Sequence, residues 1–465
     1  MAETPKNSEP SKRTESWWSK NWFYITLVLV AVIGGGCAFT LPYHVQREGD
    51  NIWSLRQAIL AATGGVLAIL TLWENRRKNI QEKEKNDQDH TRQVHAERRA
   101  RYAKAVEQLA DDKSAIRLGG VYTLAKLVDD WLDDEKTLPS MEKRRQEGQI
   151  IIDSLCAYIR SSFPLAERND ELTLSYEEYQ QKYQNNKQSK QSREDFVRDK
   201  SLFREEQEVR QTILSEIKKR LNGGEVKREN GKYEIKLGTW SYFEYNFLNT
   251  VFFYRVDFSN SYFGTSSNFS RAEFIDFADF SGAKFIDFAE FYWSADFSGV
   301  KFTGYANFPG VKFTWGADFS GAEFTQNANF PWVKFTGYAN FCEAKFTKKA
   351  NFGRAEFTEE ASFPRVKFTK KANFCEAKFT RKADFSEAKF DEKPIFEYAL
   401  DSETYKARFS HRANPEDYNF EASDNSRYKI ETEEKEYDGA KFIIPKGTEL
   451  FDPDEPSDLE DDDES

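Results

Sequence analysis

The chain has 465 residues and a formal net charge of −11 at pH 7, and this length allows about two to four domains. The charge is uneven, because residues 256–294 are net acidic and residues 295–390 are net basic. The cysteines, at positions 37, 156, 342 and 375, have the spacing of neither a metal site nor a disulfide framework, which favours a reducing compartment.

The first part of the chain predicts a membrane hairpin. Residues 1–21 are polar, and we expect them to be disordered. Residues 22–43 are apolar over the length needed to cross a bilayer and have Trp and Tyr at their ends, which predicts transmembrane helix 1. Residues 54–73 predict transmembrane helix 2, with Arg56 close enough to its edge to reach the interface.

The positive charges around the hairpin predict its orientation. Lysines and arginines flank its outer ends, whereas the connecting loop has only Arg47. The positive-inside rule then places both termini and the following domains in the cytoplasm, at the inner (plasma) membrane of a cell. We expect the glycines at 34–36 and 64–65 to let the two helices pack closely. A cleaved signal peptide and a lipid-modified Cys37 are alternatives that the sequence disfavours, since a second span follows at once and Cys37 follows three glycines.

Helical segments are expected next. Residues 74–100 are almost wholly polar and predict an exposed helical stalk. Residues 101–163 predict a small helical domain, capped at its start by Asp112 or Ser114. One face of its first helix is predicted to hold Leu118, Val121, Tyr122, Ala125, Val128 and Leu132.

The segments around the central repeats have weaker patterns. Residues 164–204 are charged and Gln-rich and predict a mobile insertion. Residues 205–255 predict a helix followed by an aromatic cap over the first repeat. Residues 397–451 predict a cap at the other end, and residues 452–465 an acidic, disordered tail.

Residues 256–396 repeat one pattern, in which a phenylalanine recurs at steps that alternate between five and six residues. Such short units fit neither helical repeats nor plain strands, but they fit a coil with four sides that closes after about 22 residues. Phenylalanines would fill its interior, and we expect this core ladder to include Phe297, Phe302, Phe308, Phe319, Phe341, Phe363 and Phe385. Two successive six-residue steps, Phe285 to Phe291 to Phe297, predict a bulge at Tyr292, Trp293 and Ser294.

These units resemble the pentapeptide-repeat family, as in Ala-Asp-Phe-Ser-Gly (317–321) and Ala-Asp-Phe-Ser-Glu (383–387). The resemblance implies a right-handed, four-sided β-helix. Every second unit departs from the family pattern, with six residues and Lys or Glu in the Asp/Asn position, which leaves its turn types open. Within residues 101–163, the run RYAKAVEQLADDKSAIRLGGVYTLAKL (101–127) and then LCAYIR (155–160) resemble the juxtamembrane helical segment of bacterial two-span pentapeptide-repeat membrane proteins. The predicted fold is therefore a membrane helical hairpin, a small α-helical domain and this solenoid.

Two surface patterns follow from the 22-residue period. Asn307, Asn329, Asn351 and Asn373 should stack into a ladder, whose first explanation is stabilising hydrogen bonds between neighbours. Basic residues should form columns that present a candidate patch for an anionic partner, either the cytoplasmic leaflet or an acidic protein. The chain's own acidic tail is an alternative occupant. The predicted patch comprises Lys345, Lys348, Lys349, Lys367, Lys370, Lys371, Arg381, Lys382 and Lys389.

No motif for phosphate binding, metal hydrolysis or a nucleophile turn occurs, so the sequence predicts no catalytic, cofactor or metal site and no enzyme. We interpret the chain as a membrane-tethered interaction scaffold for an unknown protein partner, with its oligomeric state left open. One alternative is a DNA mimic directed at a type II topoisomerase, as in the fluoroquinolone-resistance pentapeptide proteins. That mimicry needs an acidic surface, and nucleic acid itself is not favoured as a partner. An oligomeric membrane pore capped by the solenoid is a further alternative.

Overall fold

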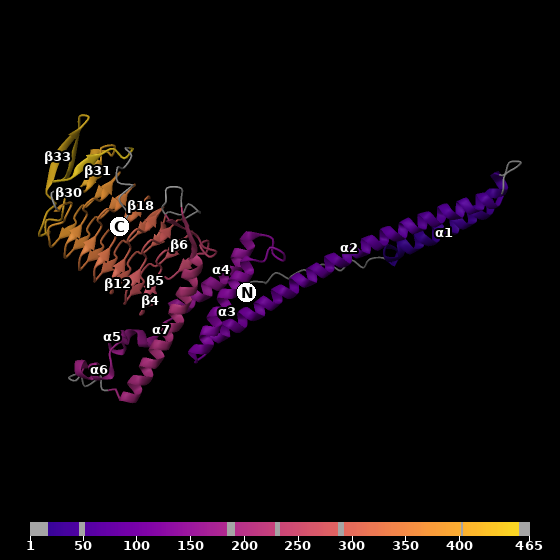
Figure 1. Cartoon of the computed structure of the whole chain (residues 1–465), viewed down its shortest axis with the longest axis horizontal. Coiled ribbons are helices and arrows are strands. Elements are labelled where there is room, and N and C mark those ends of the chain that lie inside the picture. Colours follow the sequence, from indigo (N-terminus) through magenta and orange to yellow (C-terminus); the bar gives the residue numbers. More distant parts are fainter. Residues whose placement is uncertain are drawn as a thin grey trace, which may run out of the picture. The chain divides into compact units, whose positions relative to one another are not determined.

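The computed structural model describes residues 17–45, 52–183, 191–227, 233–286, 293–400 and 403–454. The chain divides into two compact units, Met1–Glu97 and Arg98–Ser465. The tail beyond residue 454 and most of the N-terminal segment, for which we predicted disorder, lie outside the described residues. Figure 1 shows the elements of both units.

The first unit contains helix α1 (Trp17–Val45) and most of helix α2 (Ile52–Leu109). Helix α1 starts at Trp17, so the predicted disorder of residues 17–21 is wrong. Both helices are long and apolar enough to cross a membrane, judged by length and composition alone. Helix α2 joins the predicted second span, the stalk and the start of the helical domain, because no Pro or Gly interrupts residues 74–109. The ion pairs of Lys78 with Glu74 and of Arg92 with Asp89 join neighbouring turns of its polar part.

The close approach of α1 to α2 involves fewer glycines than predicted. A Cβ atom on Gly34 would lie 2.2 Å from Thr63 Cγ2, so a larger residue at this contact would force the Thr63 side chain or the helices to shift. Gly35 and Gly36 have open space around them, as do Gly64 and Gly65. The expectation that all five glycines form the packing surface is therefore wrong.

The second unit begins with a bundle of α2, α3 (Ser114–Leu132), α4 (Met141–Arg160) and α7 (Arg193–Leu221). Val121 and Val128 of α3 are fully buried, as the helical spacing predicts, but Tyr122 is 54% exposed and does not belong to the buried face. The predicted caps are also wrong. Lys113 occupies the N-cap position of α3, and the Asp111 carboxylate accepts a hydrogen bond from its backbone N–H at 2.8 Å.

The described part of residues 164–204 is folded, which corrects the prediction of a mobile insertion. It contains η1 (Pro164–Arg168), α5 (Asn169–Leu172), α6 (Tyr176–Tyr183) and the start of α7. The rings of Tyr179 and Phe196 are buried and stack with centroids 4.7 Å apart. The Arg168 guanidinium also pairs with the Asp199 carboxylate at 2.7 Å. The sequence does not predict these aromatic and ionic contacts, because the residues that make them do not recur at a helical period.

Among the described residues, the short strands of the repeats form four parallel sheets, which we name faces 1 to 4 in chain order. Face 1 consists of β3 (Tyr245–Asn246), β7 (Ser267–Asn268), β11 (Trp293–Asp296), β15 (Gly316–Asp318), β19 (Ala339–Asn340), β23 (Ala361–Ser362), β27 (Ala383–Asp384) and β32 (Tyr418–Asn419). Face 2 consists of β4 (Val251–Phe252), β8 (Glu273–Phe274), β12 (Lys301–Phe302), β16 (Glu323–Phe324), β20 (Lys345–Phe346), β24 (Lys367–Phe368) and β28 (Lys389–Phe390).

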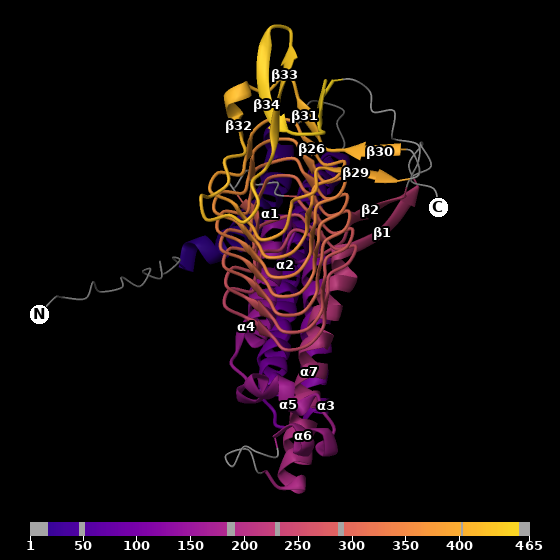
Figure 2. The same ribbon diagram turned by 90° about the vertical axis from the view of Figure 1, so that its left-hand side faces the viewer.

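The other two sheets complete the tube. Face 3 consists of β5 (Val256–Asp257), β9 (Ala278–Asp279), β13 (Ala306–Asn307), β17 (Ala328–Asn329), β21 (Ala350–Asn351) and β25 (Ala372–Asn373). Face 4 consists of β6 (Tyr262–Phe263), β10 (Lys284–Phe285), β14 (Lys312–Phe313), β18 (Lys334–Phe335), β22 (Glu356–Phe357), β26 (Lys378–Phe379), β31 (Arg408–Ser410) and β35 (Glu449–Phe451). Figure 2 shows the coils stacked on one another.

The solenoid is longer than predicted at both ends. Strands β3 and β4 pair with β7 and β8, so the aromatic segment before residue 256 is the first coil and not a cap over it. Helices α4 and α7 pack against β3 and β5 and cover this end, with the hairpin of β1 (Asn222–Lys227) and β2 (Tyr233–Leu237) beside face 4. At the other end β31, β32 and β35 extend the sheets, and the hairpin of β33 (Thr432–Tyr437) and β34 (Ala440–Pro445) buries Phe442 and Ile444.

Phenylalanine fills the interior of the tube. All seven ladder phenylalanines named above are fully buried at 0% exposure. Rings on the same face stack in parallel, as Phe319 does on Phe341 with centroids 5.0 Å apart and planes 2° apart. Most contacts between rings on different faces are edge to face, as for Phe341 and Phe352 at 5.4 Å and 85°. Both arrangements are the favourable ones for aromatic pairs.

One coil contains six extra residues. Lys284 pairs with Lys312, 28 residues further on, whereas Lys312 pairs with Lys334 after 22 residues. The register of β11 against β15 also shifts between Trp293 and Ala295, which confirms the predicted irregularity. Phe291 and Tyr292, which we placed in the ladder and the bulge, lie outside the described residues. Since the rings of Phe285 and Phe313 stack directly, the ladder continues across the insertion without an additional rung.

Candidate interaction surface of the solenoid

The alternation of five- and six-residue steps reflects two kinds of corner. The five-residue steps join face 1 to face 2 and face 3 to face 4, and each contains a residue with positive φ, such as Gly321 (64°) or Glu343 (60°). In these turns an Asp or Asn accepts a hydrogen bond from the backbone two residues on, as Asp318 Oδ1 does from Ser320 N at 2.9 Å. The six-residue corners do not use this turn. Lys and Glu therefore stand on faces 2 and 4 at the position that Asp or Asn takes on faces 1 and 3.

The asparagine ladder lies in register on face 3, as predicted. Asn307, Asn329, Asn351 and Asn373 pair strand by strand. Asn373 Nδ2 donates to Asn351 Oδ1 at 3.0 Å, and Asn307 Nδ2 donates to Asp279 Oδ1 at 3.2 Å. The Asn329 side chain makes no hydrogen bond to any other described residue, so its amide can meet a ligand on this face.

Many charges on the rod pair between successive coils. Lys345 pairs with Glu323 at 2.7 Å, Arg381 with Glu359 at 2.9 Å and Lys382 with Glu360 at 2.7 Å. Lys370 pairs with Glu392 at 3.2 Å. Each pair joins residues one coil apart, so the carboxylates neutralise part of the predicted basic patch.

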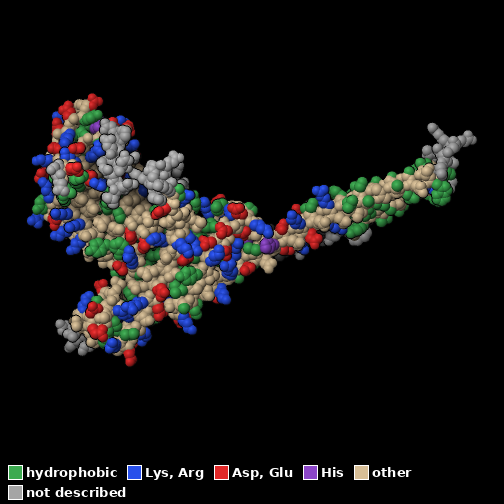
Figure 3. Space-filling view, viewed as in Figure 1, with side chains coloured by type: hydrophobic (Ala, Val, Ile, Leu, Met, Phe, Trp, Pro, Cys, Tyr) green, Lys and Arg blue, Asp and Glu red, His purple; other side chains and the backbone are tan. Residues whose placement is uncertain are grey.

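The predicted patch is therefore not one surface. Arg381 and Lys382 lie at the corner between faces 4 and 1, diagonally opposite the corner between faces 2 and 3, because the chain visits the faces in order. The other exposed lysines gather on face 2 and at the corner between faces 2 and 3, where they form no ion pair with any described residue. We name this set the lysine strip; it consists of Lys348, Lys349, Lys367, Lys371 and Lys389. Figure 3 shows basic side chains gathered on the later coils of the solenoid.

A groove runs along face 3 beside the lysine strip, with a volume of about 630 Å³. Its floor is formed by Asn329, Asn351 and Asn373, and one wall carries Lys349 and Lys371. The opposite wall is formed by the corner between faces 3 and 4 and by the hairpin of β29 (Glu397–Leu400) and β30 (Glu403–Lys406). That hairpin projects from the side of the coils in Figure 2.

The hairpin wall presents apolar side chains to the groove. Trp332, Tyr398 and Leu400 line it and are 47%, 51% and 49% exposed. Cys375 also lines the groove, and its Sγ–H donates to the Tyr405 carbonyl oxygen at 3.0 Å, which ties the hairpin to the corner. Burial, with Glu376 beside it, raises the pKa of the Cys375 thiol to about 11, so this cysteine is a neutral tether and not a nucleophile at neutral pH.

The sequence did not reveal this groove. Tyr398 and Leu400 lie in a segment that we assigned only to a cap, and they come close to Trp332 because the hairpin folds back along the coils. One signal was present. Trp332 stands at a corner where other coils have Gly310, Arg354 or Glu376, all with positive φ. A large apolar side chain at a strained, exposed corner points to a contact surface.

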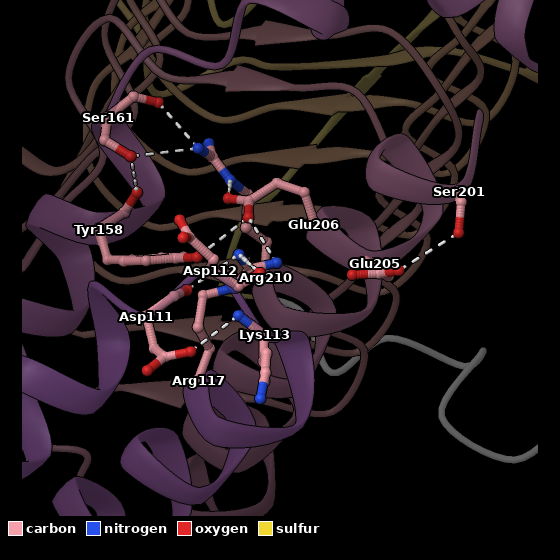
Figure 4. A network of polar contacts seen from close by, with 10 residues as sticks. All are labelled: Asp111, Asp112, Lys113, Arg117, Tyr158, Ser161, Ser201, Glu205, Glu206 and Arg210. Carbon is pink, nitrogen blue, oxygen red and sulfur yellow. Dashed lines mark hydrogen bonds and ion pairs between the residues drawn. The ribbon is translucent and has the colours of Figure 1, made fainter. Parts of the chain in front are cut away.

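A buried polar network joins helix α7 to the C-terminal end of helix α4 (Figure 4). The Arg210 guanidinium donates to Glu206 Oε1 at 2.6 Å, to the Ile159 carbonyl at 2.8 Å and to the Ser161 carbonyl at 3.0 Å. The Tyr158 hydroxyl donates to Glu206 Oε2 at 3.0 Å, and burial, with the charge of Glu206 beside it, raises the pKa of Tyr158. These groups satisfy one another, so the network is structural. Within the described residues no cluster of His, Cys, Asp and Glu could hold a metal ion.

The fold and surface define a β-solenoid with an aromatic core, capped at both ends. A family profile for pentapeptide repeats, with nine copies, matches residues 289–331. The solenoid of this chain therefore contains pentapeptide repeats, which confirms the repeat type predicted from the sequence. Solenoids of this family are generally non-enzymatic structural or interaction proteins. No curated protein and no solved structure matches the chain significantly.

Proposed function

We propose that the protein is a non-enzymatic interaction scaffold, anchored in a membrane by α1 and the first part of α2, that presents its solenoid to an anionic partner in the cytoplasm. The lysine strip is the observation that carries this proposal. From Lys345 to Lys389, the other basic side chains pair with glutamates one coil away. The five exposed lysines of the strip have no counter-charge among the described residues. Adjacent like charges on neighbouring strands are unfavourable in isolation, and an anionic partner relieves that repulsion.

The N-terminal helices support the membrane part of the proposal. Trp22, Val32 and Phe39 of α1 and Ile69 and Leu72 of α2 are each at least 60% exposed. Such apolar surface is unfavourable in water and favourable in a lipid bilayer. The lysines and arginines outside both spans favour the cytoplasmic placement of the solenoid.

Proximity labelling in native membranes tests this function. A biotin ligase fused to the C-terminus would label neighbours of the wild-type chain and of a variant with all five lysines of the strip changed to Glu. We expect a set of cytoplasmic neighbours that the variant loses, while its membrane location is unchanged. Identical neighbours for both chains, or labelling only outside the cytoplasm, would contradict the proposal.

The alternatives predicted from the sequence receive no comparable support. A DNA mimic needs a continuous anionic surface, whereas the lysine strip runs along the later coils. No feature of the described residues favours a pore. A labelling result dominated by a type II topoisomerase would replace the scaffold proposal with the mimic.

A further inference from the structure

We infer that the groove on face 3 binds an extended acidic peptide segment of a partner protein, with one apolar side chain seated between Trp332 and the β29–β30 hairpin. This inference rests on the proposed scaffold function and names the chemistry of the partner. The groove has three surfaces that fit three parts of such a segment.

The apolar wall fits a side chain of the partner. Tyr398 and Tyr405 are directly paired across the hairpin, and both line the groove with Leu400. Trp332 lies on the same wall, and the Arg354 guanidinium packs over its ring at 5.9 Å. Exposed tryptophan and tyrosine side chains are the residue types that most often anchor a protein interface.

The opposite wall supplies charge. Lys349 and Lys371 belong to the lysine strip and line the groove one coil apart, so carboxylates on alternate residues of an extended chain can reach both. The hairpin side also carries Glu376, but Arg354 pairs with it at 2.7 Å. Among the described residues that line the groove, the unpaired charge is therefore positive, which selects an acidic segment.

The floor and the hairpin can bind the backbone of the segment. The Asn329 and Asn351 amides point onto face 3, and the Nδ2 group of each donates to no other described residue, so both can donate to carbonyl oxygens. Strands β29 and β30 pair with each other and with no other described strand. Their outer edges offer backbone groups that an added strand can use. An extended peptide satisfies these groups, whereas a lipid headgroup has no backbone to pair with them.

Fluorescence anisotropy with the full chain in detergent tests this inference. The probe is a short fluorescein-labelled peptide of alternating Asp and Thr with one central Leu. We expect saturable binding, about tenfold weaker for a matched peptide with Asn in place of Asp, and about tenfold weaker for one with Ser in place of Leu. Absence of binding, or equal binding of all three peptides, would overturn the inference.

Variants locate the site. K349E/K371E should weaken binding about tenfold. W332G should do the same without strain in the corner, because Gly310 occupies that corner one coil earlier with a φ of 64°. The charge-matched control K367E/K389E changes lysines of the strip outside the groove and should alter binding by less than about twofold. An equal loss for the control would assign binding to general charge and overturn the groove.

A chain that ends at Asp454 distinguishes a partner from the protein's own acidic tail. We expect this chain and the full chain to bind the probe equally. Binding that appears only after truncation would make the tail the occupant and overturn the inference. If the peptide fails to bind while proximity labelling still depends on the lysine strip, the groove assignment fails and the scaffold function stands.

Discussion

Phe341 and Phe363 stand one coil apart, with ring centroids 4.9 Å apart and planes inclined by 1°. Phe341 also stacks on Phe319 at 5.0 Å, so it is one rung of a continuous aromatic column on face 1. Because a repeat contacts only its neighbours, the stability of the rod depends on each rung in turn.

Replacing Phe341 should destabilise the solenoid. F341A removes a fully buried ring and should lower the free energy of unfolding by about 3 to 5 kcal/mol. F341L keeps most of the apolar volume and should cost less than about 1.5 kcal/mol. Urea denaturation followed by circular dichroism measures both. Equal, small losses for the two variants would mean that the ring does not fill the tube.

Asp318 should matter for its hydrogen bonds and not for its charge. Its Oδ1 accepts from Ser320 N at 2.9 Å and from Asn340 Nδ2 at 3.0 Å. Burial raises the pKa of Asp318, so the ionised form is disfavoured in the folded chain and acid relieves that cost. D318A should therefore destabilise by about 1 kcal/mol, whereas D318N should be neutral or stabilising at pH 7. A larger loss for D318N than for D318A in thermal melts would contradict this reading.

Removing one partner of the buried Arg210–Glu206 pair should strongly lower the free energy of unfolding. R210M leaves the Glu206 carboxylate, which is 7% exposed, without its closest partner and should cost about 3 to 5 kcal/mol. The double variant R210M/E206Q leaves no buried carboxylate and should recover part of this loss. Denaturation of R210M, E206Q and the double variant gives the coupling free energy between Arg210 and Glu206. An additive cycle would show that the two side chains act independently.

Asp134 should add acid-sensitive stability to the helical bundle. Although burial opposes its ionisation, hydrogen bonds from Thr137 and the Arg98 guanidinium lower the pKa of Asp134 to about 2. A carboxyl group with a lowered pKa stabilises the fold above its unfolded pKa, and this contribution disappears as the pH falls from about 4 to 2. D134N should lower the free energy of unfolding by about 1 to 2 kcal/mol at pH 7, and this free energy should fall less steeply between about pH 4 and 2 than in the wild type. The exposed neighbour provides the control, since D133N should leave the profile unchanged.

The sequence predicted the features that repeat and missed those that occur once. Phe341 and Asn351 recur at the coil period, so their burial and their ladder could be expected. The pairing of Lys345 with Glu323 also follows from the coil period, because a Glu stands one coil before the Lys, whereas the predicted patch includes the lysines alone. The first coil at Tyr245 was missed because its irregular aromatic residues obscured the period.

The groove could not be predicted in the same way. It depends on the fold of one hairpin, which brings Tyr398 and Leu400 to the corner that holds Trp332. The buried network of Arg210 likewise joins residues from separate helices, and a one-dimensional pattern does not reveal such a contact. The helices of residues 164–183 are short and are held by Tyr179 and Arg168, so they have no strong amphipathic period.

The central claim is that a membrane anchor holds the solenoid in the cytoplasm, and fractionation combined with protease protection of a C-terminal tag tests it most directly. We predict that the chain sediments with membranes, resists carbonate extraction and dissolves in detergent, and that protease cleaves the tag only after the membrane is permeabilised. Recovery of the chain in the soluble fraction, or cleavage of the tag on intact cells, would contradict the account.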